Sequence, residues 1–108
     1  MSRTTDRLVR NQILFREVNE RVREVVEGED GRIEFLCECS NPDCIETLVL
    51  TNAFYEHVRS RATLFVLAEG HERLEVERVV DRGPGYVLVE KHVGADLLRE
   101  SDPRSAGT

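Results

Sequence analysis

The sequence lacks the features that mark several large classes of protein. Its 108 residues carry a net charge of −6, with arginines and glutamates interspersed. There is no basic face for binding phosphates, so nucleic acid is not an expected partner. No apolar run approaches the length of a membrane span, and no apolar signal core follows the polar residues 1–10. We therefore expect no membrane association and a cytoplasmic location.

The common catalytic signatures are missing as well. The chain has no glycine-rich phosphate loop, no H-E-x-x-H, no G-x-S-x-G and no obvious nucleophile–base pair. It also has no internal repeat and no low-complexity segment. A hydrophobic fraction of 40% and a charged fraction of 33% fit one globular domain with one modest core. An enzyme consequently ranks last among the functions considered below.

After a flexible start at 1–4, the pattern predicts a helix over 5–28, with Thr4 or Thr5 as its cap and Gly28 as its stop. Its apolar stripe steps by threes, fours and one seven: Leu8, Phe15, Val18, Val22 and Val25. We favour a helix that lies on the domain's sheet. The same stripe also fits a short heptad, so self-association through this helix stays open.

The remainder predicts an α+β fold: a long N-terminal helix, then a mainly antiparallel sheet of about five strands with one short inserted helix. We expect residues 32–99 to form an α+β part that packs with the helix as one domain, and 100–108 to form a disordered tail. A turn is expected at 29–31. Expected strands cover 32–39, 47–50, 63–68, 74–81 and 86–91, and expected helices cover 53–61 and 94–99, with a helix at 75–80 as an alternative.

All three cysteines fall within eight positions, as Cys37, Cys39 and Cys44. In the cytoplasm, clustered cysteines indicate metal ligands or redox groups more than structural disulfides, and an odd count leaves one thiol unpaired. Extended residues two apart are separated by about 6.6 Å, whereas two sulfurs on one zinc are under about 4 Å apart. The strand must therefore curl at or just after Cys37.

A closed structural zinc site needs four ligands, and three histidines compete for the fourth position. We rank His71 first, because it lies in a turn directly after a core strand. His57 lies among charges in the short helix, and His92 ends the last strand. A lone histidine can also be an ordinary surface or hydrogen-bonded residue.

Two other interpretations of the cysteines stay open. Cys37 and Cys39 can be small core residues on the apolar face of a strand, although Cys44 lies in a polar loop. Alternatively, Cys39 and Cys44 can form a reversible disulfide across the turn. The clustering, the compartment and the odd count favour one zinc ion, or a similar thiophilic metal, held by Cys37, Cys39, Cys44 and His71.

Several short pieces resemble a family of small uncharacterised proteins from high-GC Gram-positive bacteria. They lie between Asn11 and Lys91: 19–22, 35–39, 42–44, 70–71, 76–80 and 89–91. In that family the cysteine cluster occurs together with a Pro-Gly-His turn, where this chain has Glu69 in place of the proline. The resemblance implies that the three cysteines and His71 belong together as one set. It implies nothing firm about activity.

Three functions remain. The first is a zinc-stabilised module that binds another protein, or a second copy of itself through the N-terminal helix, in a regulatory role. The second is a thiol and zinc redox sensor. The third is a small zinc enzyme with an open three-cysteine site, in which Glu38, Asp43 or Glu46 serves as the base.

Overall fold

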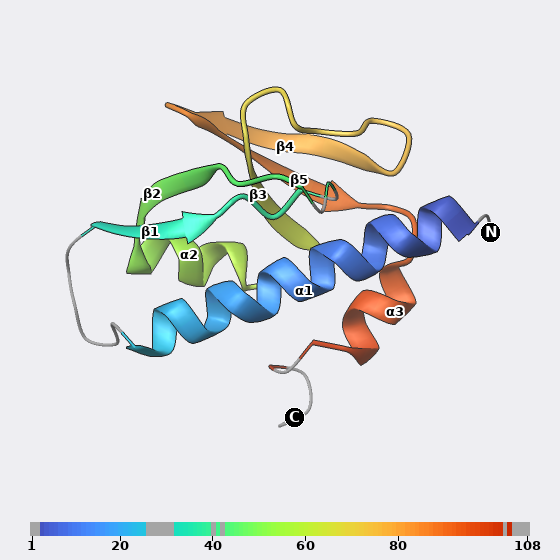
Figure 1. Ribbon diagram of the computed structural model, residues 1–108, viewed down its shortest axis with the longest axis horizontal. Helices are drawn as coiled ribbons and strands as arrows, with labels where there is room; N and C mark the ends of the chain where they lie inside the picture. The colour runs from blue at the N-terminus through green and yellow to red at the C-terminus, as the bar shows by residue number, and fades with distance from the viewer. Residues whose placement is uncertain (1–2, 26–31, 40, 42, 103, 105–108) are drawn as a thin grey trace.

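The computed structural model describes residues 3–25, 32–39, 41, 43–102 and 104, and it confirms the α+β prediction (Figure 1). In chain order the elements are α1 (Arg3–Val25), β1 (Arg32–Leu36), β2 (Thr47–Thr51), α2 (Asn52–Val58), β3 (Leu64–Ala68), β4 (Glu77–Gly83), β5 (Tyr86–Lys91) and α3 (Ala95–Glu100). In Figure 1, α1 lies between the strands and α3.

The five strands form two antiparallel sheets, where the sequence suggested one. β1 pairs with β2, and the second sheet has the order β3-β5-β4. The two sheets meet where the chain leaves β1, because the Glu38 N–H donates to the Val66 carbonyl at 2.9 Å. The Ala68 N–H donates to Cys37 Sγ at 3.2 Å. Residues 37–38 thus cover the edge of β3 that faces away from β5.

The apolar core fills the space between these sheets and α2. All five residues of β3 are buried, which confirms the prediction of a strand covered on both faces. Phe35 of β1 stacks on Tyr55 of α2 with ring centroids 4.4 Å apart, and both side chains are fully buried. Burying an aromatic side chain of this size contributes roughly 1.5–3 kcal/mol. The short helix is therefore held to the first sheet.

The β4–β5 hairpin confirms the expected strand pairing and excludes the alternative helix at 75–80. β5 covers the predicted residues, whereas β4 begins at Glu77 because a turn closes between Arg73 and Val76. At the tip, Gly83 packs under the Tyr86 ring, where an added Cβ would lie 2.2 Å from a ring carbon. A larger residue at this position would therefore have to displace the Tyr86 ring.

The predicted stripe of α1 is only partly buried: Val22 packs against the core, but the most buried face of the helix is a different one. The fully buried side chains are Val9, Gln12, Arg16 and Asn19, whereas Val18 of the predicted stripe is 40% exposed. Spacing by three and four residues does define the buried face, but three of its four members are polar. They are stable there because each meets a partner: Arg16, for example, donates to the carbonyls of Ala62 and Leu98.

Several helix ends also differ from the prediction. α1 begins at Arg3, so Thr4 and Thr5 lie inside the helix and neither caps it. Thr51 caps α2, accepting from the Phe54 N–H at 3.1 Å, and the helix ends at Val58 and not near Arg61. The predicted stop at Gly28 and the turn over 29–31 lie outside the described residues.

Two residues within the predicted tail, Asp102 and Arg104, make ion pairs in the structure. Asp102 is buried and its carboxylate accepts from the buried guanidinium of Arg59. Arg104 donates to both carboxylate oxygens of Glu20 at 2.7 Å, and its guanidinium also lies 2.8 Å from Glu56. These ion pairs tie residues 102 and 104 to α1 and α2. Residues 103 and 105–108 lie outside the described part of the chain.

Candidate metal centre

The structure brings Cys37, Cys39, Cys44 and His71 together from three places in the chain. Cys37 and Cys39 directly follow β1, Cys44 precedes β2, and His71 follows β3. One ligand atom from each residue lies within 4.8 Å of the other three. The group could therefore hold a metal ion.

The distances fit a small tetrahedral ion. Nδ1 of His71 lies 3.5 Å from Cys37 Sγ and 3.6 Å from Cys44 Sγ. In a tetrahedral zinc site, bond lengths of about 2.3 Å to sulfur and about 2.0–2.1 Å to nitrogen place these atoms about 3.5–3.6 Å apart. Two of the three sulfur–nitrogen edges of such a site therefore have the expected length.

The backbone curls where the sequence requires it. β1 ends at Leu36, one residue before Cys37, and the two thiols that follow are each only 2% exposed. The return toward β2 is closed by the Cys44 N–H, which donates to the Asn41 carbonyl at 3.1 Å. The Asn41 side chain accepts from the Asp43 N–H at 3.0 Å. This Asx turn brings Cys44 back to the other two cysteines.

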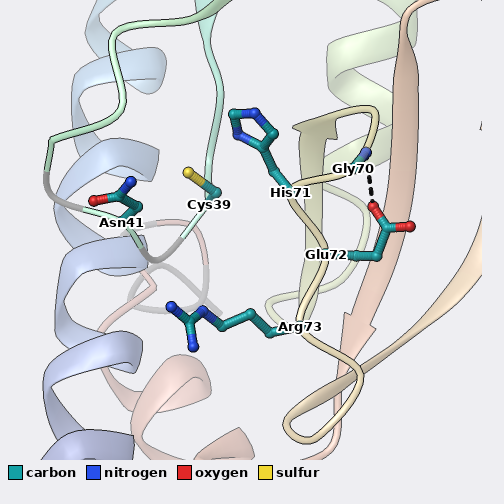
Figure 2. Close-up of a pocket in the computed structure, with 6 residues that line it drawn as sticks. All are labelled: Cys39, Asn41, Gly70, His71, Glu72 and Arg73. Carbon is teal, nitrogen blue, oxygen red and sulfur yellow. Dashed lines mark hydrogen bonds between the residues drawn. The ribbon is translucent and has the colours of Figure 1, made fainter.

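A tight turn after β3 presents His71. Its N–H donates to the Ala68 carbonyl at 3.1 Å, and Gly70 inside the turn has φ +87°. A positive φ at this position favours glycine, and the Gly70 N–H is held at 3.0 Å by Glu72 Oε1 (Figure 2). The imidazole therefore points back over the cysteine loop, as Figure 2 shows for Cys39.

The electrostatics of the three thiols differ. Hydrogen bonding with the Cys37 thiol, and then with His71 and the Asn41 backbone, lowers the pKa of Cys39 to about 5 against the opposing effect of burial. The pKa of Cys37 is raised, first by its hydrogen bond with Cys39 and then by burial. Burial raises the pKa of Cys44.

Sequence reasoning missed the role of Glu38. Its carboxylate points away from the sulfurs and is fully buried, where it accepts from Tyr55 at 2.6 Å, Asn19 at 3.0 Å and the Val66 N–H at 3.2 Å. Burial raises the pKa of Glu38, against the lowering effect of these donors. Because side chains alternate along a strand, the sequence places Glu38 on the opposite face from Cys37 and Cys39. Nothing near Glu38 in the sequence identifies its hydrogen-bond partners.

A hollow of ≈ 350 Å³ opens beside the cluster and is lined by Cys39, Asn41, Gly70, His71, Glu72 and Arg73. Figure 2 shows the Arg73 guanidinium extending toward the Asn41 side of the hollow, while Glu72 points away. Arg73 thus lines the hollow, and its guanidinium pairs with Glu75 at 3.4 Å.

The other two histidines lie outside the cluster. His57 is exposed on α2, 6.2 Å from the Phe54 ring by centroids, and His92 is exposed after β5. All three cysteines are free thiols, so the alternative disulfide between Cys39 and Cys44 is not formed. The alternative that the cysteines are small core residues agrees with Cys37 and Cys39, which are buried. It does not account for Cys44, which is partly exposed.

Comparison with known proteins identifies no relative: no protein family, no curated protein and no solved structure matches this chain. Among the described residues, none of the helices combines the length and the apolar character that crossing a membrane requires.

Proposed function

We propose that the protein is a structural zinc protein whose metal centre is Cys37, Cys39, Cys44 and His71. The observation that carries the proposal is the cluster of four ligand atoms within 4.8 Å of one another. Three thiolates with one imidazole favour zinc over magnesium or calcium, and iron–sulfur clusters usually take four cysteines.

Four protein ligands complete a tetrahedral zinc, so the metal would stabilise the fold and leave no position open for substrate. We therefore infer a binding or regulatory module that acts in the cytoplasm, where the clustered cysteines stay reduced. The partner would be another protein or a second copy, bound through α1. The exposed side of that helix supports this, because Leu14 is 56% exposed and Val18 is 40% exposed.

Elemental analysis tests the metal centre directly. The wild type would be purified under reducing conditions without added metal or a chelating tag, beside Cys44→Ser, His71→Ala and the matched control His92→Ala. About one zinc per chain in the wild type and in the control, lost together with thermal stability in the other two, is the expected result. Zinc retained in His71→Ala would mean a site with an open fourth position. A metal-free wild type would refute the metal centre.

A redox sensor is the second candidate function, and the thiol geometry favours it. The three sulfurs are close enough for a pair to form a disulfide if the metal leaves, and Cys44 is partly exposed to an oxidant. Hydrogen peroxide at low concentration should then release zinc from the folded protein with a change in circular dichroism. A holo-protein that keeps its zinc under these conditions would eliminate the sensor.

The enzyme interpretation loses one of its proposed groups. Glu38 was a possible base, but its carboxylate faces Asn19 and Tyr55 in the core and not the metal cluster. Asp43 and Glu46 remain on the exposed side of the cysteine loop. With His71 as a ligand, a water on the metal is not required.

A further inference from the structure

Glu38 lies between two metal ligands and uses every polar group it has in contacts with the core. Its N–H donates to the Val66 carbonyl at 2.9 Å, and its carbonyl accepts from Gln12 at 3.2 Å. Its carboxylate accepts from Val66, Asn19 and Tyr55. The residue is fully buried. The segment that carries both buried thiols is therefore fixed through its middle residue.

The partners of Glu38 come from three different elements. Gln12 and Asn19 belong to α1, Tyr55 to α2 and Val66 to β3. Asn19 also holds Leu36 at both backbone atoms, donating to its carbonyl at 2.9 Å and accepting from its N–H at 2.7 Å. The face of α1 that is buried is thus the face that holds residues 36–38.

We propose that Glu38 is a positioning residue that couples metal binding to the docking of α1. This inference rests on the proposed metal centre. A metal bound by Cys37 and Cys39 fixes the backbone on both sides of Glu38, and the fixed backbone places its carboxylate for Asn19 of α1. Coupling of this kind is reciprocal, so a docked α1 also presents the two thiols in the binding geometry.

A purely structural role for Glu38 predicts a different result. A buried hydrogen-bonded carboxylate that only supports the core would lower the stability of the metal-free and metal-bound protein equally when it is changed. Zinc affinity would then stay the same, because binding affinity depends on the difference between the two states. Measuring zinc affinity and amide hydrogen exchange in α1 therefore distinguishes a positioning role of Glu38 from a purely structural one.

The experiment compares wild type, Glu38→Gln, Tyr55→Phe and the matched control Glu34→Gln. Glu34 lies four residues earlier on the exposed face of β1 and accepts from Thr47 at 2.9 Å. Tyr55→Phe removes only the hydroxyl that donates to Glu38, so it serves where Glu38→Gln fails to fold. Zinc affinity is measured by competition with a chromophoric chelator. Amide hydrogen exchange over residues 9–19 is measured with and without zinc.

We expect zinc to slow exchange in α1 of the wild type and of Glu34→Gln about tenfold. Glu38→Gln should bind zinc about tenfold or more weakly and lose most of this protection, with Tyr55→Phe changed in the same direction. Wild-type affinity in both core variants, or α1 exchange that zinc does not change, would overturn the coupling and leave the metal centre intact. A wild type that binds no zinc would refute the metal centre and the coupling with it.

Discussion

Replacing Asp102 by asparagine should destabilise the protein by about 2–3 kcal/mol, because it leaves the Arg59 guanidinium buried without its closest carboxylate. Both side chains of this ion pair are almost completely buried. Breaking a buried pair by removing one partner costs roughly 3–5 kcal/mol. Nε of Arg59 lies 3.6 Å from Glu20, which keeps a second carboxylate nearby and reduces the expected cost.

The same pair predicts a pH dependence with a defined sign. Burial alone would raise the pKa of Asp102, but the Arg104 N–H and the Arg59 guanidinium outweigh it and hold the pKa below its usual value. A carboxylate with a lowered folded-state pKa stabilises the protein above the unfolded value of about 3.9. That stabilisation is lost as the pH falls through the folded-state pKa. The stability difference between wild type and Asp102→Asn should therefore shrink below about pH 5.

Urea denaturation followed by circular dichroism measures both effects. The matched control is Asp96→Asn, since Asp96 is exposed on α3 and pairs with Arg99 at 3.4 Å. This control should change stability by less than about 0.5 kcal/mol at any pH where the protein is folded. Equal stability of the two variants would refute the reasoning, because it would mean that Asp102 does not hold the C-terminal segment against Arg59.

Three further outcomes are expected. Val9→Ala should cost about 2 kcal/mol in urea denaturation and Leu14→Ala less than about 0.5, since only Val9 is buried; the reverse order would contradict the packing of Val9 in the core. Gly70→Ala and Gly85→Ala should each lower the free energy of unfolding by about 1–2 kcal/mol, because both glycines have a positive φ and open space around Cα. Only Gly70→Ala should also weaken zinc binding, measured by competition with a chelator. A strong chelator should lower the melting temperature of the wild type and leave that of Cys44→Ser unchanged; equal shifts would show that the chelator acts elsewhere.

The cysteine cluster could be predicted from the sequence because its ligands lie close together along the chain. Three cysteines within eight residues, with turn residues between them, already require a curled backbone. His71 followed from a glycine turn after an apolar strand. That turn forms with Gly70 at φ +87°, and it places the imidazole against the sulfurs. Both inferences needed only neighbouring residues, whose spacing fixes the geometry.

The buried face of α1 could not be predicted from the sequence in the same way. Hydrophobic periodicity assumes that apolar residues face the core, but this helix buries Gln12, Arg16 and Asn19. The partners of Arg16 are carbonyls of Ala62 and Leu98, which lie 46 and 82 residues away in sequence. No pattern within the helix reports such distant acceptors. The C-terminal ion pairs were missed for the same reason, since Asp102 and Arg59 are 43 residues apart.

The spacing of Cys37 and Cys39 does more than bring two sulfurs to one side. Because side chains alternate along an extended chain, a single intervening residue must point to the opposite side. That residue is Glu38. Its N–H donates to the Val66 carbonyl at the edge of β3, and its carboxylate accepts from the Val66 N–H. Cys37 Sγ supplies the next acceptor along that edge, for Ala68. One short segment thus carries two thiols that could hold a metal and also pairs with the open edge of β3, so we expect the identity of its middle residue to matter for metal binding as well as the spacing.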